Sequence, residues 1–151
     1  MKRIALIGPN GIGKSTLLNL IRNKIQPDHG RIIHHGEINY IPQIDYTDTT
    51  NNFKSVGEKR LTLIENTIWL PGSLLLLDEP TVYLDENNIE NLLYLLKNYN
   101  GALLVASHDN KRELLQHKIN DKIVALQQKS NNYNHFKSQK DSTRPFYLAQ
   151  S

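Results

Sequence analysis

Short, continuous apolar runs alternate along the chain with longer stretches in which apolar residues recur at helical spacing. The continuous runs predict buried strands at 3–7, 74–78, 102–107 and 121–127. Two further short strands are predicted around Gly36, within 31–42. The helical spacing predicts helices at about 14–25, 57–69, 86–98 and 110–117. Strands that alternate with helices are typical of an α/β domain with a mainly parallel sheet, which binds ligands beyond the carboxyl ends of its strands.

The loop after the first strand carries a phosphate-binding pattern. GPNGIGKST at 8–16 fits G-x-x-x-x-G-K-[ST] and lies between a predicted strand and a predicted helix, the context that this pattern requires. Main-chain N–H groups of such a loop, with the positive end of the helix, attract phosphate oxygens. Lys14 supplies a charge for the β- and γ-phosphates, and the hydroxyl of Ser15 is a candidate Mg²⁺ ligand. The candidate ATP-binding residues are Gly8, Asn10, Gly11, Gly13, Lys14, Ser15 and Thr16.

Two acidic residues follow the apolar run at 74–77. In phosphoryl transfer, an acidic residue at such a strand end holds Mg²⁺. Adjacent strand residues point in opposite directions, so Asp78 is expected at the metal and Glu79 at the attacking water, as a general base.

The order and spacing of these motifs resemble the ATP-binding cassette (ABC) ATPases over roughly residues 1–140. YIPQ at 40–43 is similar to their Q-loop, TVYLD at 81–85 to their D-loop and SHD at 107–109 to their switch histidine. The resemblance implies an ABC-type core of the P-loop NTPase fold, with ATP and Mg²⁺ as cofactors. It implies that Gln43 contacts Mg²⁺ and the attacking water, and that His108 contacts the γ-phosphate. The candidate catalytic residues are then Glu79, His108 and Gln43, and the candidate metal ligands are Ser15, Gln43 and Asp78.

SVGEK at 55–59 resembles the signature with which a cassette clasps the γ-phosphate held by the opposite cassette. The resemblance implies that Ser55 and Gly57 bind that nucleotide, so hydrolysis would need a homodimer or a separate partner chain. Val56 stands where the family has glycine, and its β-branched side chain adds bulk and resists positive φ. An ordinary helix start capped by Ser55 is the alternative interpretation.

The segment 44–54 is much shorter than the helical subdomain that most cassettes carry there, so we expect a minimal subdomain. The chain resembles the first cassette of ABC-F proteins in three features, which are this short segment, the stretch EPTVYLD and the stretch SNNYNHFKSQK. ABC-F proteins are tandem-cassette ATPases that act on ribosomes, some of them in antibiotic resistance. It differs from them in lacking a second cassette and any aromatic residue before Tyr40 that could stack on adenine. A shortened amino terminus is the simplest explanation. The resemblance implies a cytoplasmic protein with the ribosome as a candidate partner.

Composition adds limits rather than a function. The 151 residues fit one domain, which we divide into a nucleotide-binding domain at 1–128 and a polar tail or linker start at 129–151. A net charge of +3 is compatible with an anionic ligand or RNA, but the charge is scattered. The absence of cysteine excludes disulfides and thiolate metal sites. No apolar stretch approaches the roughly 20 residues of a membrane span, so we expect no direct membrane insertion.

Other residues are expected to be structural. Trp69 and Tyr94 are predicted to pack in the core or at its edge, and Lys59 and Arg60 to lie on solvated faces. Two alternatives to an ABC-F-like ATPase stay open. One is the ATPase subunit of an ABC transporter, and the other is a non-catalytic nucleotide-binding remnant.

Overall fold

A computed structural model describes residues 2–43, 56–108 and 122–125. The strands in these ranges are β1 (Arg3–Ile7), β2 (Ile38–Ile41), β3 (Leu74–Asp78), β4 (Ala102–Ser107) and β5 (Lys122–Ala125). The helices are α1 (Lys14–Ile21), α2 (Val56–Ile68) and α3 (Glu86–Asn98). The strands form one sheet in the order β2-β3-β4-β1-β5, with every neighbouring pair parallel. The predicted α/β fold with a parallel sheet is therefore confirmed.

Some predicted features lie outside the described residues. These are Ser55, the short segment 44–54, the helix at about 110–117 and the tail at 129–151. Of the helices that the structure does describe, none is long and apolar enough to cross a membrane.

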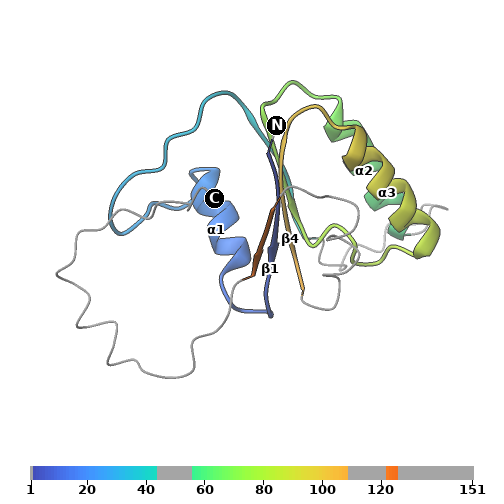
Figure 1. Cartoon of the computed structure of the whole chain (residues 1–151), viewed down its shortest axis with the longest axis horizontal. Coiled ribbons are helices and arrows are strands. Elements are labelled where there is room, and N and C mark those ends of the chain that lie inside the picture. Colours follow the sequence, from blue (N-terminus) through green and yellow to red (C-terminus); the bar gives the residue numbers. More distant parts are fainter. Residues whose placement is uncertain (1, 44–55, 109–121, 126–151) are drawn as a thin grey trace.

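Helices cover both faces of the sheet, with α1 on one side and α2 and α3 on the other (Figure 1). The residues of β3 serve the two sides in turn. Leu76 packs in a cluster with Leu18 of α1, whereas Leu75 and Leu77 pack in a second cluster with Ile64 of α2 and residues of α3. Burial on both faces explains why this strand is an unbroken apolar run in the sequence.

The register of the sheet aligns the carboxyl ends of four strands. Ile41 at the end of β2 pairs with Leu77, and Asp78 at the end of β3 pairs with Ala106. Ile7 at the end of β1 pairs with Ser107 at the end of β4. The residues that follow these strands therefore emerge at one edge of the sheet, where open parallel sheets bind their ligands.

Only the second of the two strands predicted within 31–42 is present. Gly36 has a left-handed φ of 86°. The hydroxyl of Ser73 donates hydrogen bonds to the carbonyls of His35 at 2.9 Å and Glu37 at 3.3 Å. The side chain of the residue just before β3 thus anchors this segment in place of a first strand.

The first helix is shorter than predicted. It ends at Ile21 rather than near 25. Asn23 then adopts a left-handed φ of 58°, a conformation that asparagine tolerates better than most residues. The N–H of Lys24 donates to the carbonyl of Asn19 at 2.8 Å, which satisfies one of the acceptors left free where the helix ends.

Three of the structural assignments made from the sequence are wrong. Trp69 is 80% exposed just beyond the end of α2, and Tyr94 is 70% exposed, because Leu92, Leu93 and Leu96 take the buried face of α3. Arg60, expected on a solvated face, is 2% exposed. It shares the inner face of α2 with Ile64, one helical turn away.

Asp85 is the N-cap of α3, and its side chain accepts a hydrogen bond from the N–H of Asn88 at 2.8 Å. We expect Asp85→Ala to lower the free energy of unfolding by about 1 kcal/mol, because this N–H loses its acceptor. Urea denaturation followed by circular dichroism measures the change. Asp85→Asn keeps an acceptor and is the matched control, so equal losses in the two variants would contradict a capping role.

Candidate nucleotide-binding site

The loop between β1 and α1 depends on two glycines for its shape. Gly11 and Gly13 have φ values of 78° and 102°, which glycine adopts without steric penalty. A Cβ at either position would meet no atom within 4 Å, so conformation rather than crowding favours glycine here. Gly13 is also the N-cap of α1 and provides no capping side chain, so N–H groups of the first helical turn are left to an anion.

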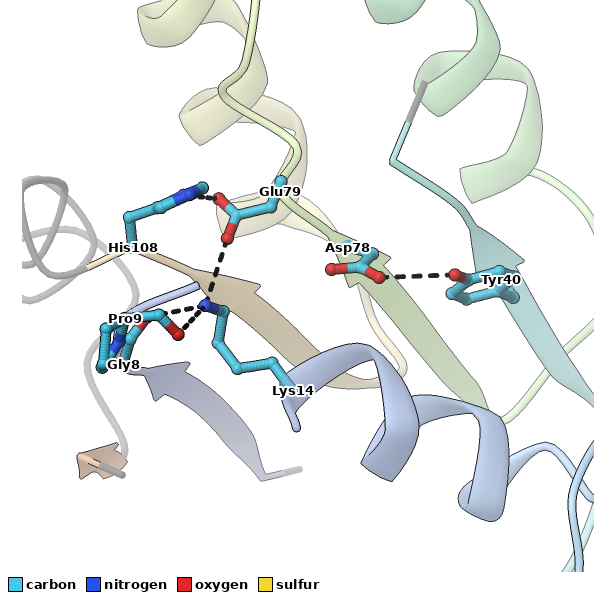
Figure 2. A network of polar contacts seen from close by, with 7 residues as sticks. All are labelled: Gly8, Pro9, Lys14, Tyr40, Asp78, Glu79 and His108. Carbon is cyan, nitrogen blue, oxygen red and sulfur yellow. Dashed lines mark hydrogen bonds and ion pairs between the residues drawn. The ribbon is translucent and has the colours of Figure 1, made fainter. Parts of the chain in front are cut away.

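Lys14 joins this loop to the end of β3. Its side chain is only 6% exposed, and Nζ donates to the carbonyls of Gly8 at 2.6 Å and Pro9 at 3.1 Å. Nζ also lies 3.6 Å from Oε1 of Glu79 (Figure 2). A buried ammonium group requires such partners because it has lost its water.

Glu79 has an unusual backbone conformation. Its φ is 48°, in the left-handed region, and it precedes Pro80, which favours an extended conformation in the preceding residue. Its N–H donates to the carbonyl of Ala106 at 2.9 Å. Because β3 ends at Asp78, this turn rather than strand alternation sets the direction of Glu79. Figure 2 shows Glu79 directed at Lys14 and His108, and Asp78 directed at Tyr40.

His108 follows β4 directly and approaches the same carboxylate. Its Nδ1 lies 2.6 Å from Oε2 of Glu79, and the imidazole is charged only when protonated. The carboxylate of Glu79 is thus close to both Lys14 and His108. Neither of its oxygens, however, has a hydrogen-bond partner within the described part of the chain. Glu79, itself 3% exposed, therefore keeps hydrogen-bonding capacity for a further donor such as water.

Asp78 is as buried as Glu79, at 2% exposed. The hydroxyl of Tyr40 donates to its Oδ2 over a long 3.5 Å, and its Oδ1 has no hydrogen-bond partner among the described residues. Burial raises the pKa of Tyr40, and the charge of Asp78 adds to this effect, so the phenol stays protonated and remains a donor. The unpaired, buried oxygen of Asp78 is suited to a cation or to water bound to one.

A cleft of about 350 Å³ lies where these elements meet. The predicted site residues that line it are Asn10, Gly11, Gly13, Lys14, Ser15, Thr16, Gln43 and Glu79. Gly8, Asp78 and His108 are predicted site residues that do not line the cleft. Gly8 contacts Lys14 and His108 contacts Glu79, and both of these partners do line it. The structure thus brings together residues that are far apart in the sequence.

Of the three predicted metal ligands, Ser15 and Gln43 line the cleft, whereas Asp78 does not line it but directly precedes Glu79, which does. The hydroxyl, amide oxygen and carboxylate of these residues are hard oxygen ligands of the kind that Mg²⁺ prefers. Within the described ranges, no three His, Cys, Asp or Glu side chains gather as a metal site.

Gly57 has a packing function that the sequence did not reveal. A Cβ at this position would lie 2.8 Å from the carbonyl oxygen of Tyr83, which is too close for a real contact. Tyr83 itself has a left-handed φ of 66°. Glycine at the start of α2 therefore allows the helix to pack on the 81–85 turn. Contact of Gly57 with a nucleotide in a second cassette stays a prediction.

Arg60 is the residue near the site that sequence reasoning missed. Its guanidinium group donates to the carbonyls of Pro42 and Asp78, the latter at 2.9 Å. These carbonyls precede Gln43 and Glu79 directly in the chain. The available signal was spacing, because Arg60 lies four residues before Ile64, which belongs to the apolar face of the predicted helix.

Comparisons with known proteins point to one family. Residues 1–54 match the family described as ABC transporter. The erythromycin resistance ATP-binding protein MsrA of Staphylococcus epidermidis is 38% identical over 128 residues, covering 72% of this chain and 26% of MsrA. The ribosome protection protein VmlR of Bacillus subtilis is 35% identical over 127 residues, covering 70% of this chain and 23% of VmlR. The ATP-binding protein Uup of Escherichia coli is 34% identical over 153 residues, covering 72% of this chain and 24% of Uup. The chain thus spans about a quarter of the length of these relatives.

Solved structures agree on the fold. The RNase-L Inhibitor structure superposes with a TM-score of 0.61 at 22% sequence identity, over 82% of this chain and 32% of that one. This similarity shows the fold alone. On the sequence matches, the chain belongs to the ABC transporter family as an ATPase domain, with ABC-F proteins among its relatives.

Proposed function

We propose that this chain binds Mg-ATP in the cleft at the carboxyl edge of its sheet and hydrolyses it when paired with a second cassette. The observation that carries the proposal is the convergence of the phosphate loop, Gln43 and Glu79 on one cleft of about 350 Å³. A glycine loop alone could bind any anion. An acidic residue and an amide facing the same space add what phosphoryl transfer requires.

The phosphate loop would hold the triphosphate. N–H groups of the loop and of the first turn of α1 would donate to phosphate oxygens, with the hydroxyl of Thr16 near the α-phosphate. Lys14 is already directed into the cleft, and its ammonium group can exchange contacts within the loop for the β- and γ-phosphates. Bound Mg²⁺, held by Ser15, Gln43 and Asp78, would neutralise phosphate charge.

Glu79 would act on the attacking water. Its carboxylate accepts a proton from the water as the water oxygen bonds to the γ-phosphorus, and the bond from that phosphorus to the β-phosphate oxygen breaks to give ADP and phosphate. His108, whose Nδ1 lies 2.6 Å from Glu79, would orient the carboxylate and contact the γ-phosphate. Gln43 would help to place the water.

We further propose an ABC-F-like role in the cytoplasm, with the ribosome as partner. The support is the kind of relative that the chain resembles, an erythromycin resistance protein and a ribosome protection protein. A second cassette, in a homodimer or on a separate chain, would complete the pair. Ser55 and Gly57 would then serve the nucleotide of that partner. Co-purification with a membrane permease would favour the transporter alternative instead.

Lys14→Ala should weaken ATP binding by at least about tenfold, because a buried, charged donor at the phosphates is lost. Titration with a fluorescent ATP analogue measures the dissociation constant. Lys24→Ala removes an exposed lysine beyond the end of α1 and is the matched control. Binding by Lys14→Ala at the wild-type affinity would refute the phosphate site.

Glu79→Gln should slow ATP turnover by about 10²-fold or more while ATP stays bound, because the amide cannot accept the proton of the water. Steady-state phosphate release measures turnover, and light scattering measures ATP-dependent pairing. Glu90→Gln, on the exposed side of α3, is the control for removing a carboxylate. Unchanged turnover in Glu79→Gln would remove Glu79 from the mechanism. A wild-type chain that pairs on ATP without turnover would instead support the non-catalytic alternative.

A further inference from the structure

Arg60 binds main chain at the ends of two neighbouring strands. The pairing of β2 with β3 ends at Ile41 and Leu77, so Pro42 and Asp78 are the next residues in the same register. Pro42 has no N–H and cannot donate a further hydrogen bond to the ladder. At this position, just beyond the paired residues, the guanidinium group of Arg60 donates instead to the carbonyls of Pro42 and Asp78.

The Asp78–Glu79 peptide group is held from both ends. Its carbonyl accepts from Nη2 of Arg60 at 2.9 Å, and its N–H donates to the carbonyl of Ala106 at 2.9 Å. The second bond is an interstrand bond to β4, made by the residue whose φ is a left-handed 48°. A strained conformation of this kind persists only where the surrounding structure holds it.

We propose that Arg60 is a positioning residue, which fixes Gln43 and Glu79 at the cleft by holding the carbonyl group just before each, the second of these being that of Asp78. The inference rests on the proposed function for what these side chains bind. The planar guanidinium group has donors in a fixed fork and reaches two carbonyls at once, which a lysine ammonium on a flexible stem does less well. A loss of Arg60 should therefore affect the magnesium side of the cleft and spare the phosphate loop.

The test compares Arg60→Met and Arg60→Lys with Arg3→Met. Arg3 also donates to two main-chain carbonyls, those of Lys97 at 2.8 Å and Tyr99 at 3.1 Å. Lys97 lies in the last turn of α3 and Tyr99 is its C-cap, so neither carbonyl borders the cleft. Binding of a fluorescent ATP analogue is measured with Mg²⁺ and with EDTA. The gain in affinity from Mg²⁺ should fall about tenfold in Arg60→Met, as for other groups that orient metal ligands. It should fall less in Arg60→Lys and not at all in Arg3→Met, while affinity in EDTA stays at the wild-type value.

A second measurement needs no nucleotide. Amide hydrogen exchange, followed by NMR in the ligand-free chain, should be faster at Glu79 in both Arg60 variants than in Arg3→Met, compared at equal global stability. If Arg60→Met does not fold, Arg60→Lys is judged by the same two measurements.

Two results would overturn the inference. One is an unchanged gain from Mg²⁺ in the Arg60 variants, and the other is Glu79 exchange no faster than in Arg3→Met. Equal losses of affinity in Mg²⁺ and EDTA are a case of the first result, since they leave the gain unchanged and indicate general loosening. A wild-type chain that binds no nucleotide would refute the proposed function, and the exchange data would still decide whether Arg60 fixes the turn.

Discussion

The in-register, parallel pairing of four strands is the constraint on which the site depends. β2, β3, β4 and β1 end at one edge of the sheet, so the residues that follow them lie near one another although they are far apart in the chain. A slip of one residue in any strand would reverse its side chains and move its end out of line. Burial of alternate residues of β3 in two different cores opposes such a slip, because it would exchange the two sets.

Two buried cations organise the main chain at this edge in the same physical way. Lys14 donates to the carbonyls of Gly8 and Pro9, and Arg60 donates to those of Pro42 and Asp78. Charged donors form stronger hydrogen bonds than neutral ones, and a buried charge has no water to compete for it. Each cation therefore stabilises a loop shape that regular secondary structure does not supply. One loop borders the proposed phosphate site, and the strand ends border the proposed catalytic side of the cleft.

The parts of the structure that the sequence predicted are those governed by local pattern. The bounds of β1, β3, β4 and α3 agree with the prediction because apolar runs and an N-cap residue mark them directly. Within 31–42, the segment where a first strand was expected is anchored by Ser73, a residue far along the chain. The exposure of Trp69 depends on where α2 ends against its neighbours. The left-handed turn at Glu79 runs against the local signal of Pro80, so the sequence gives no sign of it. The phosphate-loop residues could be proposed from the sequence because the spacing of the glycines, the lysine and the serine is what phosphate binding requires.

The start of α2 is tied to the site at two points, which bears on how pairing with a second cassette would act. Gly57 packs against the carbonyl of Tyr83 in the turn after Glu79, with no room for a Cβ, and Arg60 holds the ends of β2 and β3 one turn further along the helix. A packed contact without free space transmits displacement instead of absorbing it. A shift of α2 would therefore change the surroundings of Gln43 and Glu79 together. Since residues 56–59 of the predicted signature segment form the start of α2, we expect a nucleotide bound there by a partner to act on this chain's own site through the same helix.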